Sequence, residues 1–335
     1  MVGTCSWQTS WEIILKRKLT EIFSQDMPFA IWPDTWYVVA RSSDILSNNV
    51  FDGIIANRPF VIYRSEFNRL IALDAHCPHM GAHLRNATVV GDNLRCALHS
   101  LTVDCNGLLL GGNACNRKPS NLWHVEERFG LIFLSMAQGL VKSLPFSDDL
   151  NEFVWKSGST LSLNADWRAM IVNGFDIKHM SSIHQRKLTK PPEFIHHKDK
   201  IVFKYSTCVT RKGGFSNWVT SFLAGERSID VKLTCLGTIM LVESTLGKIK
   251  STAIFGILQE GNKVRAFNAF GVLPYSNFWR IRLYLTRWLY YWFLRKDFSV
   301  IEDMQLNVQG IDDLGVVAIS NYLNSLPDLE EKQPS

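Results

Sequence analysis

The 335-residue sequence predicts an α+β fold, with a β-rich first half and a second half that combines an antiparallel sheet with helices. Short β-branched and aromatic runs separated by turn residues recur after Trp36, and longer runs recur between residues 201 and 273. Apolar residues at helical spacing follow Asp166 and occur again near the C-terminus. A content of 46% hydrophobic and 20% charged residues allows two filled cores and excludes a disordered chain.

The first half is expected to begin with an N-terminal helical arm over residues 1–33, with a helix from Trp11 to Phe23. A small β-sandwich follows over residues 34–145. Its predicted strands are Trp36–Ala40, Phe60–Tyr63, Leu70–Leu73, Leu108–Leu110 and a single closing strand within residues 123–134. A turn-rich stretch through Pro145 marks the boundary, and a second domain is expected over residues 150–335.

Four residues with metal-ligand chemistry occur in two short stretches. The first reads Cys77-Pro78-His79, and after sixteen residues the second reads Cys96-Ala97-Leu98-His99. Zinc accepts two cysteines and two histidines, but zinc modules usually pair like residues within a loop. Mixed loops suit a two-iron cluster in which one iron takes both cysteines and the other takes both histidines. A zinc-containing binding protein remains the alternative.

These loops resemble the Rieske domain of bacterial-type oxygenases. Respiratory-chain Rieske proteins carry an extra cysteine in each loop, and Ala82 stands at that place in the first loop here. The resemblance implies that residues 34–145 form a Rieske β-sandwich domain. It also implies a [2Fe-2S] cluster whose ligands are Cys77, His79, Cys96 and His99. The second loop departs from the family pattern, because Ser100-Leu101 stands where Gly-Trp is common.

A second polar series, Asp176, His179 and His184, lies on the helix expected after Asp166. Two imidazoles and one carboxylate can hold ferrous iron and leave open positions. At about 100° per residue, His179 and His184 lie about 140° apart on a straight helix, so a helix end or loosened turn is expected near Ser181. Alone, each histidine fits an ordinary core position and Asp176 fits a helix cap.

Together with a Rieske cluster, the series matches the Asp-x-x-His-x-x-x-x-His pattern of Rieske oxygenases. The resemblance implies that His179 and His184 bind a mononuclear Fe(II). It implies that Asp176 links an iron-bound histidine to a cluster-bound histidine of a neighbouring subunit. The third iron ligand is expected to be Asp303, in a segment that resembles the family's C-terminal helix. A solvated helix charge is the alternative for Asp303. Other candidate carboxylates are Glu193, Glu226, Asp230, Glu243, Glu260, Asp297, Glu302 and Asp312.

The same resemblance implies a catalytic mononuclear-iron domain over residues 150–335 with a helix-grip (START-like) fold. Its expected strands are Thr160–Leu163, Ile201–Thr210, residues 231–243, Lys250–Gln259 and Val264–Leu273. A substrate pocket is expected between the sheet and the C-terminal helix. The aromatic residues proposed to line it, or else to form plain core, are Phe175, Phe222, Phe255, Phe267 and Phe270.

The function implied is that of the oxygenase component of a Rieske non-haem iron monooxygenase that uses O2 to hydroxylate a small hydrophobic or polycyclic substrate. Demethylation and desaturation are the alternatives, and a Rieske electron carrier is the less favoured one. Electrons are expected from NAD(P)H through a separate reductase or ferredoxin, because the chain has no Gly-rich dinucleotide loop. The chain length resembles the homotrimeric branch of the family.

Charge and cysteine usage narrow the partners and the compartment. A net charge of +5 spread along the chain gives no reason to expect nucleic acid. The other cysteines have no regular spacing, and the first twenty residues lack a long apolar core, so a reducing cytoplasm is expected.

Residues 278–296 form an aromatic run with five cations, too short and too charged to span a bilayer. A helix over the pocket or a subunit contact is favoured there, and contact with a membrane surface is the alternative.

Overall fold

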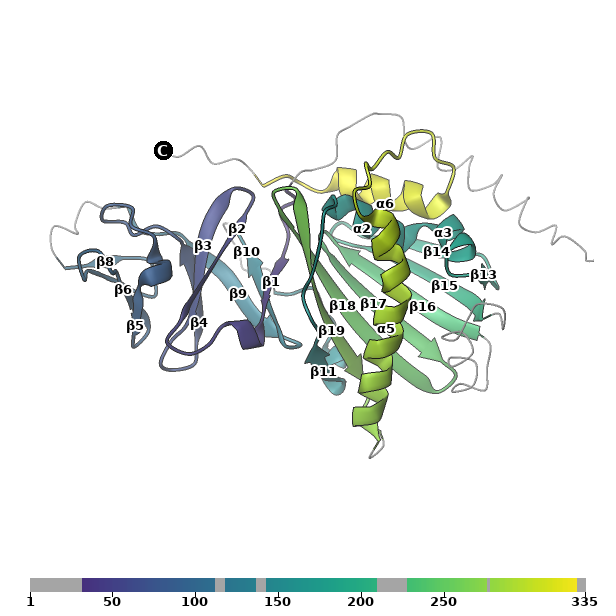
Figure 1. Cartoon of the computed structure of the whole chain (residues 1–335), viewed down its shortest axis with the longest axis horizontal. Coiled ribbons are helices and arrows are strands. Elements are labelled where there is room, and N and C mark those ends of the chain that lie inside the picture. Colours follow the sequence, from purple (N-terminus) through teal and green to yellow (C-terminus); the bar gives the residue numbers. More distant parts are fainter. Residues whose placement is uncertain (1–31, 112–117, 137–142, 210–227, 276–277, 330–335) are drawn as a thin grey trace, which may run out of the picture.

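The computed structural model describes residues 32–111, 118–136, 143–209, 228–275 and 278–329 (Figure 1). The predicted helix from Trp11 to Phe23 lies outside the described residues, as do Phe222 and Glu226. Two sheet-rich regions lie side by side in Figure 1, with the N-terminal strands at one end and the helices at the other. The expected α+β class is confirmed.

A six-stranded antiparallel sheet, in the order β1-β10-β9-β4-β3-β2, forms the first region. Its strands are β1 (Tyr37–Arg41), β2 (Val50–Ile55), β3 (Arg58–Arg64), β4 (Leu70–Asp74), β9 (Leu122–Arg128) and β10 (Leu131–Ser135), with a 3-10 turn η1 (Ser42–Asp44). The prediction of one closing strand over residues 123–134 is wrong. Phe129 and Gly130, with φ of 59° and 75°, make a tight turn that divides it into β9 and β10.

A four-stranded sheet extends from this region and carries the two cysteine–histidine loops. Its strands, in the order β5-β6-β7-β8, are β5 (Thr88–Val90), β6 (Asn93–Arg95), β7 (Thr102–Val103) and β8 (Leu109–Leu110), preceded by η2 (Leu84–Asn86). The first loop joins β4 to η2, and the second joins β6 to β7. Beneath them Tyr63, Leu73 and Leu84 form a buried cluster that includes Cys77 and Cys96. The loops therefore stand on a packed base.

A nine-stranded antiparallel sheet follows η4 (Asp148–Glu152) and has the path β11-β19-β18-β17-β16-β15-β13, with β12 beside β19 and β14 beside β15. Its strands are β11 (Val154–Ser157), β12 (Leu161–Leu163), β13 (Arg186–Leu188), β14 (Glu193–His196), β15 (Ile201–Val209), β16 (Ser228–Leu236), β17 (Ile239–Leu246), β18 (Ile249–Glu260) and β19 (Lys263–Val272). The prediction of one strand over residues 231–243 is wrong, because a turn at Gly237, with φ of 65°, separates β16 from β17.

Both faces of the nine-stranded sheet are buried along β18 and β19, whereas β16 exposes alternate residues. Along β18, Phe255 and Ile257 point to the cluster formed with the helices, whereas Ile254 and Leu258 pack toward the six-stranded sheet. The two sheets meet most closely where β1 crosses β18. A Cβ atom at Gly256 would lie 2.2 Å from Val38, so only glycine fits this position without rearrangement. The nine-stranded sheet thus separates the six-stranded sheet from the helical layer.

In the part of the chain that the structure describes, four α-helices form that layer: α2 (Trp167–Phe175), α3 (Ile177–Ser182), α5 (Trp279–Ile301) and α6 (Leu314–Ser325). Figure 1 shows α5 lying across the sheet face, with α6 and α2 near its C-terminal end. No helix among the described residues is long and apolar enough to cross a membrane. The helix predicted within residues 278–296 forms part of α5.

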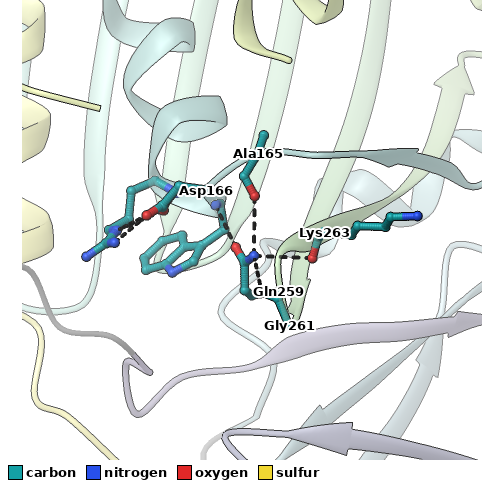
Figure 2. Close-up of polar contacts among 7 residues, drawn as sticks. Ala165, Asp166, Gln259, Gly261 and Lys263 are labelled. Atoms are coloured by element: carbon teal, nitrogen blue, oxygen red, sulfur yellow. Dashed lines mark hydrogen bonds and ion pairs between the residues drawn. The ribbon is translucent and has the colours of Figure 1, made fainter. Parts of the chain in front are cut away.

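One glutamine fixes the start of α2 on the β18–β19 hairpin (Figure 2). Gln259 Oε1 accepts from Trp167 N at 2.9 Å, and its Nε2 donates to Ala165 O at 3.3 Å and to Lys263 O at 3.2 Å. Asp166 caps the helix by accepting from the backbone N–H two residues later, at 2.8 Å. The helix that leads to the histidines therefore has a fixed origin on the sheet.

Candidate metal centres

Each cysteine–histidine loop is closed by the same two backbone hydrogen bonds. In both, the cysteine N–H donates to the carbonyl five residues later, at 2.9 Å from Cys77 and 2.8 Å from Cys96. The cysteine carbonyl accepts from the N–H four residues later, which belongs to Gly81 in the first loop and to Ser100 in the second. Both of those residues have positive φ, 75° and 58°. The loops therefore share one backbone shape.

The loops bring their four candidate ligands together. Cys77 and Cys96 are buried, whereas His79 is half-buried and His99 is exposed. The two Nδ1 atoms lie 3.2 Å apart. Two nitrogens each about 2.1 Å from one metal would lie at this separation with an angle of about 100° between them.

Burial, together with the neighbouring Cys96 thiol, raises the pKa of the Cys77 thiol. Coordination to iron would deprotonate it.

A helix break at Asp176 places the next two histidines. This residue ends α2 and also begins α3, with φ −70° and ψ 109°, and its carboxylate accepts from His179 N at 2.9 Å. Helix α3 then ends at Ser182, as the spacing of the histidines required, and His184 follows outside it. The two rings therefore approach each other even though a straight helix would separate them.

A buried carboxylate holds the start of α3 against α6. Asp313 accepts from Ile177 N at 3.3 Å and Lys178 N at 3.0 Å, and also from Gly315 N and Val316 N, at 2.9 and 3.2 Å. Burial raises the pKa of Asp313 despite these donors. One side chain thereby caps two helices.

Two histidines and one aspartate meet in the interior. His179 Nε2 lies 3.2 Å from His184 Nε2, and Asp297 Oδ1 lies 2.9 Å from the first nitrogen and 2.8 Å from the second. All three residues are buried. Three ligand atoms at right angles around a metal, each about 2.1 Å from it, would lie about 3.0 Å apart. The three atoms therefore fit one face of an octahedral iron site.

The surroundings favour the protonation states that metal binding needs. Burial lowers the pKa of His184, which keeps its imidazole neutral. Burial opposes ionisation of Asp297, but hydrogen bonds from His179 and His184 outweigh it and hold the pKa of this carboxyl below its usual value. The Phe293 ring stacks on His184 with centroids 3.6 Å apart, and Arg186 covers the Phe293 ring. This stack fixes the plane of the imidazole.

The expectation that Asp303 joins the two histidines is wrong. Helix α5 ends at Ile301, and Asp303 lies in the following turn with φ of 59°. Its backbone N donates to Asn164 O at 2.7 Å, and its carboxylate accepts from the side chain of Asn164. Asp303 is exposed, whereas Asp297 is buried beside both imidazoles.

The pattern around Asp297 could have identified it. Phe293, Asp297 and Ile301 are spaced four residues apart on one face of α5, and this face is buried. A single carboxylate between apolar neighbours on a buried face needs a partner. Glu302 and Asp303, by contrast, follow the last helical residue.

A cavity opens beside the three residues. It is lined mainly by apolar side chains from α2, the nine-stranded sheet and α5, including Met170, Leu233 and Phe298. No lysine or arginine is among the described residues that line it. Burial raises the pKa of Tyr205 to about 12, so this lining residue keeps its hydroxyl proton. The polar lining residues outside the triad are Asn173, Tyr205, Asn268 and Tyr290.

The aromatic residues predicted to line a pocket fall into two groups. Phe255 lines the cavity. Phe175 and Phe270 are fully buried in the core between sheet and helices, and Phe267 is buried on the opposite face of the sheet. The pocket reading therefore holds for Phe255, and the plain-core alternative holds for Phe175, Phe267 and Phe270. Phe267 and Phe270 are three residues apart on β19, so they point to opposite faces of the sheet.

Comparison with known proteins agrees with the N-terminal region. The family model for the Rieske [2Fe-2S] domain matches residues 35–125. The vanillate O-demethylase oxygenase subunit of Pseudomonas sp. (strain HR199 / DSM 7063) is 30% identical over 174 residues, which are 48% of each chain. Cholesterol 7-desaturase nvd of Bombyx mori is 24% identical over 47% of this chain and 36% of its own. The matches thus span about half, or less, of the length of these curated relatives.

Solved structures match over most of the chain. Dicamba monooxygenase bound to dicamba has a TM-score of 0.66 at 17% identity, over 88% of this chain and 97% of that one. Pseudomonas putida CBB5 NdmA with caffeine has a TM-score of 0.63 at 17% identity, over 87% and 88%. These likenesses show a shared fold. Residues 35–125 are therefore similar to the Rieske [2Fe-2S] domain, and the chain as a whole shares the fold of dicamba monooxygenase and NdmA.

Proposed function

We propose that the chain is the oxygenase component of a Rieske non-haem iron monooxygenase. The observation that carries this proposal is the buried set of His179, His184 and Asp297 at the edge of an apolar cavity. An electron carrier needs no such set. An iron held there would supply oxygen activation, and a cluster in the Rieske domain would supply electrons one at a time.

The ligand assignments follow from the two groups of residues. We assign Cys77, His79, Cys96 and His99 to the [2Fe-2S] cluster. We assign the mononuclear iron to the two inner histidines and Asp297. In this reading residues 34–145 form the Rieske domain and residues 150–335 the catalytic domain, and the nine-stranded sheet supports the iron site from one side.

The protein's own residues prepare the site. The Phe293 ring holds the orientation of His184, and the capped start of α3 holds His179. Apolar side chains around the cavity exclude water from the reacting atoms. Tyr205 keeps its proton and can donate a hydrogen bond to an oxygen on the substrate.

The cavity favours a neutral, hydrophobic substrate, because no cationic side chain among its described lining residues could pair with a carboxylate or sulfonate. This lining agrees better with a polycyclic, sterol-like substrate, as in the name of the relative cholesterol 7-desaturase, than with an acidic one such as vanillate. Desaturation and O- or N-demethylation are the alternative reactions on the same residues.

We further propose a homotrimer in which Asp176 carries electrons between subunits. Its carboxylate is half-buried at the start of α3, beside the backbone of His179. A separate reductase or ferredoxin would supply electrons at the exposed His99 and half-buried His79. A reducing cytoplasm is the proposed compartment, which suits the free thiols of Cys105 and Cys208.

Iron analysis of paired variants tests the site. In Asp297→Ala, the iron content of the fully loaded protein should fall from about three to about two per chain, and substrate-dependent O2 uptake with a surrogate reductase should vanish. Asp303→Ala, six residues away and exposed, is the matched control and should keep both. His179→Ala should behave like Asp297→Ala.

The rival functions give different results. A pure electron carrier would hold about two irons per chain with or without Asp297. A zinc protein would lack the visible absorption of a two-iron cluster. If Asp303→Ala lost iron and Asp297→Ala retained it, the ligand assignment would be reversed.

A further inference from the structure

We propose that the outer face of α5 docks on an anionic membrane surface. The helix has two different sides, and the iron-site chemistry uses one of them. The other side presents exposed aromatic and aliphatic side chains between cations. Docking is inferred from this face alone, and it does not require the proposed oxygenase activity.

The inner side of α5 is accounted for by the fold. Leu283, Phe293, Leu294, Asp297 and Ile301 fall within an arc of about 100° at 100° per residue. They contribute to the core or line the cavity. This side therefore has no surface left for a partner.

The outer side carries large apolar residues that face solvent. Phe278 is 67% exposed, Ile281 57% and Tyr284 69%, and Tyr275 just before the helix is 74% exposed. On a helical projection Ile281, Tyr284 and the half-buried Trp288 lie opposite the inner arc, and the N-cap residue Phe278 lies to one side. Exposed apolar residues gathered in one place mark an interaction site more often than scattered ones do. Figure 1 shows this end of α5 at the lower edge of the molecule.

The same segment is strongly cationic. No acidic residue occurs from Gly261 to Lys296, a stretch that contains seven lysines and arginines. Five of these lie in the helix region: Arg280, Arg282, Arg287, Arg295 and Lys296. No ion pair between described residues involves any of these five. Arg280 and Arg295 are exposed, whereas the Nε of Arg287 is buried and Arg282 donates to Leu273 O at 3.5 Å. The charge that this face presents to solvent therefore comes mainly from Arg280, Arg295 and the half-buried Lys296.

Two of these cations lie against tryptophan rings, one near each end of α5. The Arg280 guanidinium lies 5.3 Å from the ring centre of Trp279, and Lys296 Nζ lies 5.1 Å from that of Trp292. Tryptophan and tyrosine favour the boundary between lipid headgroups and acyl chains, while lysine and arginine extend toward anionic headgroups. A helix lying in the plane of the membrane combines these two preferences.

A membrane fits this face better than a second copy of the chain. In a twofold dimer the same face meets itself, which would bring the cations together without acidic partners. An anionic lipid surface supplies negative charge along the whole helix and accepts the aromatic side chains at its boundary. Charge complementarity therefore favours the lipid over a twofold dimer, and the oligomeric state measured below tests a contact between other faces.

Docking would also place the cavity near the lipid, because Phe293, Leu294 and Phe298 of the same helix line it. A hydrophobic substrate held in the membrane would then lie about one helix diameter from the cavity. This part rests on the proposed function.

Vesicle co-sedimentation of the full-length protein tests the docking. We expect the protein to pellet with phosphatidylcholine vesicles that contain phosphatidylserine, less with phosphatidylcholine alone, and less at high salt. The double variant Ile281→Glu/Tyr284→Glu should bind at least about tenfold more weakly. Phe67→Glu is the matched control, because Phe67 is 70% exposed on a loop of the N-terminal region, and it should pellet like the unaltered protein.

Three results would overturn the proposal: no pelleting of the unaltered protein with anionic vesicles, equal pelleting of the double variant, or equal loss in the Phe67 variant. If the double variant instead changed the oligomeric state in analytical ultracentrifugation while vesicles bound neither protein, the face would be a subunit contact. Iron content and O2 uptake with a soluble substrate are measured without vesicles, so a failure of the proposed function would be seen separately.

Discussion

At the scale of single residues, Ser100 holds a backbone conformation that glycine adopts more easily. Its φ is 58°, and Gly81 takes the equivalent place in the first loop with φ of 75°. Ser100→Gly should therefore raise the free energy of unfolding by about 0.5–1 kcal/mol, because the left-handed strain disappears. Chemical denaturation, followed by the visible absorption of the cluster, measures this change.

The reverse substitution in the first loop provides the control. A Cβ atom at Gly81 would meet nothing within 4 Å, so Gly81→Ser adds backbone strain without a steric clash. It should lower the free energy of unfolding by about 1 kcal/mol. If the two substitutions change the free energy of unfolding in opposite directions, the result supports the shared loop shape. A change in the same direction would refute it.

The pKa of His184 gives a prediction for the metal-free protein. Burial lowers this pKa, so protonation should occur below the ordinary value of about 6.5. The native state then loses stability as the pH falls below the unfolded-state value, because the unfolded chain binds this proton more readily. Histidine NMR titration of the metal-free protein checks it. A midpoint at or above the ordinary value would contradict the burial argument.

Residue chemistry predicted most of the site, and helix geometry explains the error. The cysteines and histidines are ligand types with characteristic spacing, so Cys77, His79, His179 and His184 could be singled out from the sequence. A lone carboxylate has no spacing signal. Asp303 was selected by resemblance to a pattern, whereas the end of α5 at Ile301 places it outside the buried face.

At the scale of elements, Asp313 should couple two helices to the iron site. Asp313→Ala would leave the N–H groups of Ile177, Lys178, Gly315 and Val316 without this acceptor. We expect a loss of about 2 kcal/mol or more in stability, together with loss of mononuclear iron. The [2Fe-2S] absorption should persist, because that cluster lies on a separate sheet. Calorimetry and iron analysis measure the two effects.

The neighbouring carboxylate is the control. Asp312 is exposed and pairs with the Lys178 side chain at the surface. Asp312→Ala should change stability by less than about 1 kcal/mol and should keep all iron, because exposed ion pairs contribute little. Equal effects at both positions would show that Asp313 has no special role in holding α3.

The strands were predicted where the apolar runs are long, and the errors lie at tight turns. Residues 123–134 and 231–243 each appear as one strand in the sequence, because a two-residue turn interrupts the β-type pattern only briefly. Gly130 and Gly237 supply the positive φ that reverses the chain. An isolated glycine in a strand pattern signals either a turn or a bulge, and only the pairing of β9 with β10 or β16 with β17 resolves which.

At the scale of the whole molecule, the arrangement of the two regions could not be derived from periodicity alone. The continuous apolar run of residues 253–258 in β18 indicates that both faces of this strand are buried, but not which elements cover each face. The contact of Val38 with Gly256 depends on which strands meet across the two sheets, and residues more than two hundred positions apart carry no local signal. Family resemblance implied two successive domains and the helix-grip fold of the second, but not the contact between their sheets.

The proposed electron transfer between subunits gives a prediction for the assembly. Cys96→Ala should remove the cluster and leave the iron site, whereas His179→Ala should remove the iron and leave the cluster. Neither variant should turn over alone. In a co-expressed mixture of the two variants, random assembly into rings of three would place an intact cluster beside an intact iron at roughly a quarter of the interfaces. Part of the activity should therefore return.

Substitution of Asp176 tests whether the recovered activity depends on the proposed electron route between subunits. The same mixture carrying Asp176→Asn in the subunit with intact iron should stay inactive, although asparagine can still accept from His179 N and preserve the start of α3. Differently tagged subunits, purified over both tags, ensure that only mixed assemblies are assayed for O2 uptake. If the mixed assemblies remained inactive with Asp176 intact, electrons would have to pass within one chain, and the exposed His99 would then serve only the external reductase.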